Sequence, residues 1–114
     1  VTVESKCGRD HHLAQSKARD TFAPIGPFIE TDLDTTNLAL KNIINGEIFQ
    51  EGNTSERIFN DEKSLELVES IMKLEPGDLI FTGTPANAEN SIVRSGYECE
   101  LSIEGLGKLN NKVI

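Results

Sequence analysis

The chain has 114 residues, enough for one domain with a modest hydrophobic core. Nineteen acidic against eleven basic residues give a formal net charge of −8, which argues against nucleic acid and anionic membranes as partners, because both attract clustered Lys and Arg. No apolar run approaches the length of a membrane span. Cys7 and Cys99 lack metal-site or redox spacing, so we expect both to be free thiols, in a cytoplasmic protein.

The first fifteen residues predict little regular structure. Val1–Val3 is β-branched and is typical of a strand end, whereas Glu4–Gln15 is polar and contains both histidines, His11 and His12. Adjacent histidines do not share a face of a helix or a strand, so they are not a natural metal pair. We favour a solvated loop for them, with an acid–base role for one of the two as the alternative.

A rigid polar segment follows at Ser16–Pro27, where Lys17 and Thr21 precede a Pro-x-Gly-Pro turn. Proline fixes φ and removes a backbone donor, and Gly26 permits conformations that other residues avoid. Such a segment could hold a lysine and a hydroxyl still, although its composition alone favours an ordinary connecting loop.

The next stretch predicts a short strand at Phe28–Glu30 and then a hairpin. Leu38–Ile44 and Glu47–Gln50 are apolar runs joined by Asn45-Gly46, the strongest short hairpin signal, because both central residues of a type I′ turn need positive φ. We expect Glu51–Ser55 to be a loop.

The clearest helix signal spans Phe59–Leu74. Asn60 or Asp61 can cap its start, and acidic residues occupy its first turn. Apolar residues recur at helical spacing, which predicts an amphipathic helix that covers a sheet. These residues are Leu65, Val68, Ile71 and Met72, with Leu67 and Leu74 at the edges of the stripe.

Three further strands are predicted. Leu79–Phe81 runs into Thr82–Pro85, Tyr97–Ile103 alternates between apolar and polar residues, and Lys108–Ile114 follows a turn at Gly105–Gly107. Together, about seven short strands and one helix predict an α+β fold dominated by antiparallel sheet.

Five motifs, taken in order, resemble the fumarylacetoacetate hydrolase family, in particular the C-terminal half of its catalytic domain. The resemblance covers Lys17–Ile114 and implies one partial catalytic domain over residues 1–114, with a β-roll-like mixed sheet and one main helix around residues 60–74. The matching motifs are Asp20-Thr21-Phe22-x-Pro24-x-Gly26-Pro27, Asn45-Gly46, Gln50 with Asn53-Thr54-Ser55 and Ile58-Phe59, Glu75–Pro85, and Ile103–Gly107.

The resemblance also implies an activity. Members cleave, decarboxylate, hydrate or isomerise small 2-keto or β-diketo acids, and a divalent metal, usually Mg²⁺ but also Mn²⁺ or Ca²⁺, stabilises the enolate formed. Lys17 corresponds to a catalytic, substrate-binding lysine, and Thr21 and Thr84 correspond to substrate-binding hydroxyls, with Thr21 near the metal. The family dimerises, so a homodimer or other self-association is expected.

Some family features are unmatched. The metal ligands of the family, a Glu-x-Glu pair and an aspartate, align upstream of Val1, so we expect no metal ligand in this chain, and neither tight Mg²⁺ binding nor turnover by it alone. Glu4 stands where the family has an arginine, and Asn87 lies in a loop that usually bears glycine. These departures favour a second interpretation, a non-catalytic dimerisation or binding module, whereas the intact segments around Thr21 and Thr84 favour an enzyme.

Overall fold

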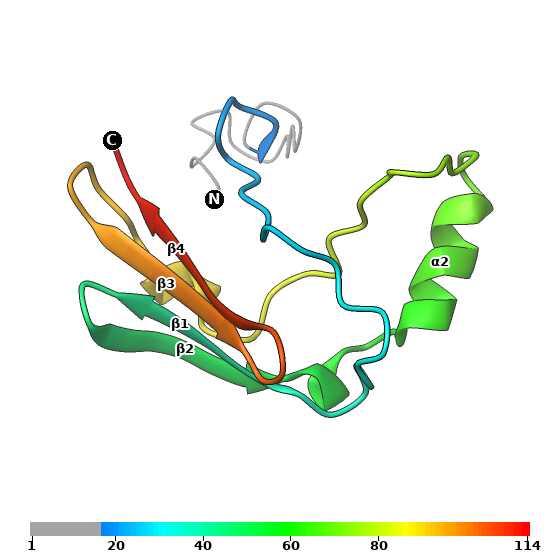
Figure 1. Cartoon of the computed structure of the whole chain (residues 1–114), viewed down its shortest axis with the longest axis horizontal. Helices are drawn as coiled ribbons and strands as arrows, with labels where there is room; N and C mark the ends of the chain where they lie inside the picture. Colours follow the sequence, from blue (N-terminus) through cyan, green and yellow to red (C-terminus); the bar gives the residue numbers. More distant parts are fainter. Residues whose placement is uncertain (1–16) are drawn as a thin grey trace.

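The computed structural model describes residues 17–114, in which one antiparallel sheet stands beside one helix, α2 (Asp61–Glu69). The sheet has four strands in the order β2-β1-β3-β4, and Figure 1 shows α2 at a distance from it with loop segments between. The strands are β1 (Ala39–Ile44), β2 (Glu47–Asn53), β3 (Glu98–Ile103) and β4 (Gly107–Lys112). Short 3-10 helices lie at Thr54–Glu56 and Ala88–Asn90.

The hairpin predicted at Asn45-Gly46 is confirmed, because both residues have positive φ, 50° and 85°, and β1 pairs antiparallel with β2. The loop predicted at Glu51–Ser55 is wrong in its first half, since β2 continues to Asn53. The cross-strand pair Lys41–Glu51 forms a salt bridge of 2.9 Å on this extension, so pairing with β1 outweighs the low strand propensity of Gly52 and Asn53.

The register gives the sheet two different faces. Residues opposite each other in an antiparallel pair point to the same side, so Leu40, Ile44, Cys99 and Leu101 share one face. The opposite face is mostly charged: it carries the Lys41–Glu51 pair, and Glu100 and Lys108 join across β3 and β4 at 2.8 Å. The alternation predicted for Tyr97–Ile103 is therefore confirmed in β3.

Two predicted strands are wrong. Phe28–Glu30 and Leu79–Phe81 are irregular, and Phe81 is 68% exposed. Apolar composition alone does not make a strand, because a strand needs a neighbour for its backbone hydrogen bonds, and the described sheet offers neither segment a partner.

The predicted helix is confirmed but is shorter than expected. Asn60 caps it by accepting a hydrogen bond of 2.8 Å from the Lys63 backbone N–H, and the regular helix ends at Glu69, five residues before the predicted end. No residue of α2 is buried, and Ile71, just beyond it, is 78% exposed, so within residues 17–114 the helix does not cover the sheet as predicted. A helix without packing partners gains little beyond its intrinsic propensity, which accounts for the early end.

The α+β fold with a mostly antiparallel sheet is thus confirmed. The buried apolar residues among those described are Leu38, which immediately precedes β1, and Ile44, the last residue of β1. In the part of the chain that the structure describes, no helix is long and apolar enough to cross a bilayer. The predictions for Val1–Val3, for the loop with His11 and His12, and for Cys7 lie outside the described residues.

Candidate substrate site

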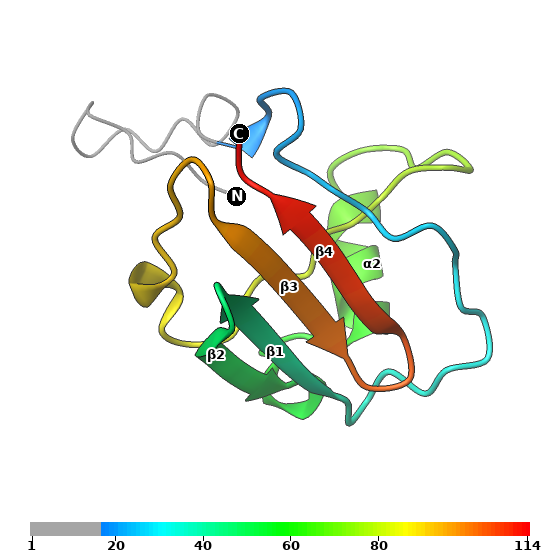
Figure 2. The same cartoon turned by 60° about the vertical axis from the view of Figure 1, so that its left-hand side comes forward.

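Thr84 lies in a loop that is fastened to the sheet by Gln50 of β2. The Gln50 side chain is 6% exposed, and its Nε2 donates to Thr84 Oγ1 at 3.3 Å and to the carbonyl oxygens of Pro85 and Ala86, both at 3.1 Å. Figures 1 and 2 show this yellow part of the chain crossing one face of the sheet beside β2 and β1. One buried amide therefore fixes three consecutive residues that have no regular structure of their own.

The oxygen end of the Gln50 amide is hydrogen-bonded as well. Gln50 Oε1 accepts from Asn42 Nδ2 at 3.1 Å and from Ser91 Oγ at 3.0 Å, and Asn42 Nδ2 also lies 3.2 Å from Ser91 Oγ. Among the described residues, no buried side-chain nitrogen or oxygen lacks a partner. A satisfied buried network of this kind holds its members in one arrangement.

A glycine lets the Thr84 loop approach β2 closely. A Cβ at Gly52 would lie 2.8 Å from Cβ and 3.1 Å from Cγ of Pro85, closer than carbon atoms approach without strain. Any side chain at position 52 would therefore displace Pro85, and with it the neighbouring Thr84.

Asn87, one of the departures from the family pattern, keeps the backbone conformation that a glycine would allow. Its φ of 64° and ψ of 26° lie in the left-handed region. Asparagine is among the few residues that enter this region readily, apart from glycine. The substitution is thus conservative for the backbone.

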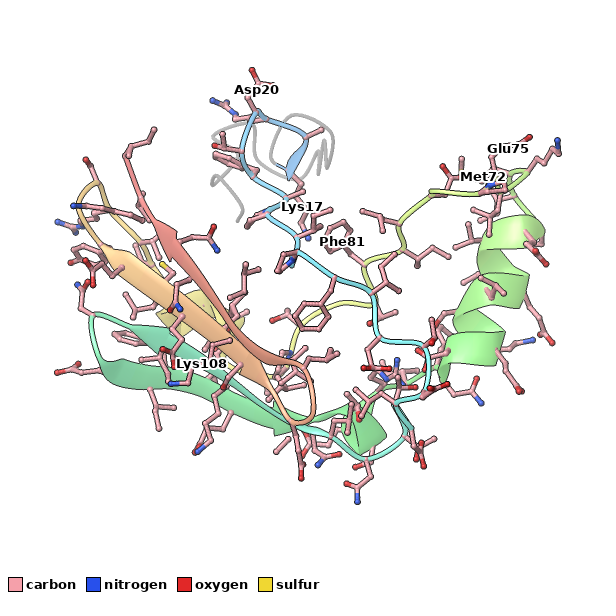
Figure 3. All side chains as sticks on the ribbon, viewed as in Figure 1. Lys17, Asp20, Met72, Glu75, Phe81 and Lys108 are labelled. Carbon is pink, nitrogen blue, oxygen red and sulfur yellow. The ribbon has the colours of Figure 1, made fainter. Side chains whose placement is uncertain are left out.

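Lys17 and Thr21 lie on a separate segment, and both are exposed. Figure 3 labels Lys17 and Asp20 on this segment, and Phe81 on the segment that leads into Thr82. Thr21 has a φ of 68°, which is an outlier for a β-branched residue. Backbone strain of this kind concentrates at functional sites, so it singles out Thr21 independently of its side-chain chemistry.

The structure fixes the predicted site residues to different degrees. Thr84 is held by the Gln50 amide, whereas no hydrogen bond within residues 17–114 joins Thr84 to Lys17 or Thr21. No three His, Cys, Asp or Glu side chains of the described residues converge to hold a metal, so these residues by themselves do not fit the divalent ion of the family.

A charged cluster holds the framework near the loop that leads into β1. Arg57 contacts Asp61, and its Nε and Nη2 donate to the Thr54 and Thr35 carbonyls at 3.0 and 3.3 Å. Hydrogen bonds from Arg57 and Thr35 lower the pKa of Asp61 below its usual value.

Cys99 is a free thiol, as predicted, and burial raises its pKa, which keeps it protonated at neutral pH.

Comparison with known proteins identifies the family. The model of the fumarylacetoacetate (FAA) hydrolase C-terminal region matches residues 3–114. The chain therefore belongs to the fumarylacetoacetate hydrolase family, as the sequence motifs indicated.

Three relatives illustrate the match. An uncharacterized protein of Methanocaldococcus jannaschii is 43% identical over 99% of this chain and 47% of its own length. The 4-hydroxyphenylacetate degradation bifunctional isomerase/decarboxylase of Salmonella dublin is 40% identical over 86% of this chain and 23% of its own length. The crystal structure of 2-hydroxyhepta-2,4-diene-1,7-dioate isomerase from Mycobacterium marinum superposes with a TM-score of 0.83 at 40% identity, over 88% of this chain and 39% of that one. The chain thus spans less than half the length of these relatives.

The polar network around Gln50 was not foreseen. The sequence marks Gln50 only as part of a motif and assigns no role to Asn42, Ser91 or Gly52. One signal was available: Asn42 and Gln50 are polar residues at positions of their strands that point to the mostly apolar face of the sheet.

Proposed function

We propose that the protein carrying this chain is an enzyme that acts on a small 2-keto or β-diketo acid through an enolate, by C–C bond hydrolysis, isomerisation or decarboxylation. The family membership and the isomerase and decarboxylase names of its relatives support this class of reaction. The observation that carries the proposal for this chain is Thr84, which is exposed yet fixed to the sheet through the buried Gln50 amide.

Each proposed residue has a chemical task. Loss of a proton or a carboxylate next to a ketone leaves negative charge on the keto oxygen, and the Lys17 ammonium supplies a compact positive charge with three donors for it. The hydroxyls of Thr21 and Thr84 would donate to the substrate's oxygens. Donors that are held in place before the charge develops stabilise the transition state without reorganisation.

The remaining parts are proposed from the family alone. Mg²⁺, or Mn²⁺ or Ca²⁺ in its place, would stabilise enolate charge when bound, with its carboxylate ligands outside residues 17–114. We also propose a homodimer in the cytoplasm. Large apolar side chains that are almost fully exposed, such as Ile29 and Ile58, support association with further polypeptide, because monomers rarely leave many such groups uncovered.

The alternative, a non-catalytic dimerisation or binding module, is not favoured. It drew on two departures from the family pattern, and of these Asn87 preserves the left-handed backbone that glycine would allow.

The test is kinetic and uses the full-length protein with saturating Mg²⁺ and a panel of 2-keto and β-diketo acids. We expect Lys17→Ala to lower kcat by about 10²-fold or more with a smaller change in KM, because the lysine matters most as negative charge grows on the enolate. Lys63→Ala, which changes an exposed lysine of α2, is the matched control and should leave both constants unchanged. An unchanged kcat for Lys17→Ala would refute the role.

A further inference from the structure

We propose that Gln50 is a positioning residue that sets the direction of the Thr84 hydroxyl, so that Thr84 presents its proton, rather than its lone pairs, to an anionic ligand. The inference rests on the proposed function only in that Thr84 binds the substrate. Gln50 is buried in β2, and under this proposal it controls what the exposed Thr84 hydroxyl can recognise.

The first step is the orientation of the Gln50 amide, which its surroundings dictate. Backbone carbonyls can only accept hydrogen bonds, and those of Pro85 and Ala86 both lie 3.1 Å from the same end of the amide. That end must therefore be the NH₂ group. The opposite end faces the Asn42 amide and the Ser91 hydroxyl, which can both donate to Oε1.

The second step concerns Thr84. Gln50 Nε2 has two protons for three oxygens, so one proton is shared, and Thr84 Oγ1, 3.3 Å away, can only accept from it. A hydroxyl has one proton and two lone pairs. With a lone pair engaged by the amide, the proton points away from Gln50.

The third step is what that direction means for a ligand. Thr84 is exposed while Gln50 is buried, so the outward proton is offered to whatever binds beside the loop. A hydroxyl that accepts a hydrogen bond is polarised into a better donor. The arrangement therefore selects carboxylate, enolate or carbonyl oxygens.

The experiment is a double-mutant cycle on the full-length protein with saturating Mg²⁺, measured by calorimetric titration with oxalate. Oxalate carries a carboxylate beside a second oxygen anion, as the enolate of a 2-keto acid does. Gln50→Glu keeps the size of the side chain but replaces the donor by an acceptor, so the Thr84 hydroxyl turns inward. It also sets a carboxylate against the Pro85 and Ala86 carbonyls, so Gln50→Met, which removes the donor without adding a charge, is measured beside it in both backgrounds. We expect oxalate affinity to fall about tenfold or more, the range for a lost hydrogen bond to a charged group.

The cycle is completed in a Thr84→Val background. If Gln50 acts through the hydroxyl, the uncharged Gln50→Met should change oxalate affinity there by no more than about twofold, since coupled residues are not additive. If Gln50 acts on the site by any route other than Thr84, the loss is as large in both backgrounds, and the inference is overturned. Ser91→Ala is the matched control: it removes a contact to Oε1 and leaves the donor end intact, so affinity should stay within about twofold of the parent protein.

Two further outcomes are distinguishable. Thr84→Val with unchanged oxalate affinity contradicts the proposed role of Thr84, and the inference falls with it. If Thr84→Val weakens oxalate binding but Gln50→Glu does not, the inference about Gln50 is overturned while the proposed role of Thr84 stands. Should Gln50→Glu fail to fold, Gln50→Met in the same cycle removes the donor without introducing a charge and must show the same coupling.

Discussion

The close contact between Gly52 and Pro85 makes the Thr84 loop sensitive to a single methyl group. In Gly52→Ala, the new Cβ would lie 2.8 Å from Pro85 Cβ and 3.1 Å from Pro85 Cγ. Restoring an ordinary carbon–carbon contact of about 3.5 Å requires a shift of roughly 0.7 Å. The proline ring is bonded to its own backbone, so the backbone of the loop must move with it.

The cost follows from two opposing effects. Overpacking of this kind costs about 1–3 kcal/mol. Alanine also restricts the unfolded chain, which returns about 0.4–1 kcal/mol. With the middle of each range, about 2 and about 0.7 kcal/mol, the net destabilisation is about 1.3 kcal/mol, or a fall in Tm of about 3–5 °C for a domain of 150–250 residues.

Calorimetry on the full-length protein measures the change in Tm, and oxalate titration measures its effect on the site. We expect a lower Tm together with weaker oxalate binding, because Thr84 moves with Pro85. Gly26→Ala is the matched control, since a Cβ there meets no atom within 4 Å. A Gly52→Ala protein with a Tm equal to or above that of the parent would refute the argument that this contact sets the position of the loop.

Two further predictions follow from the backbone and the charges. Thr21→Gly should raise Tm, because it relieves about 1–3 kcal/mol of backbone strain at a φ of 68° and costs only about 0.5–1 kcal/mol through the larger conformational entropy of the unfolded chain. We expect kcat/KM to fall in the same variant. A lower Tm would show that Thr21 is not strained. Asp61→Asn should reduce the free energy of unfolding in urea at pH 7 by about 0.2–1 kcal/mol, since the Arg57–Asp61 pair is partly exposed. The folded-state pKa of Asp61 is lowered, so this stabilisation is present above the unfolded pKa of about 3.9 and is lost as the pH falls through the lowered value. A difference that does not shrink as the pH falls below about 3.9 would contradict the assignment.

The sequence alone determined those features that depend on neighbouring residues. Asn45-Gly46 makes its turn because both residues tolerate positive φ, and Asn60 caps α2 because its side chain reaches a backbone N–H three residues on. The alternation in β3 is likewise local, since successive side chains of a strand point to opposite faces. The order of the motifs was sufficient to identify the family.

Only the tertiary structure decided which segments pair and what holds the site. Leu79–Phe81 has the composition of a strand, but among residues 17–114 no strand pairs with it, whereas β2 extends through Gly52 because β1 is there to pair with it. Thr84 could be named from its motif, yet its anchor, Gln50, lies 34 residues earlier in the chain. Local propensity carries no information about contacts over such separations, which exist only once the sheet has formed. The role of Gln50 follows from buried donors and acceptors that must be paired in three dimensions.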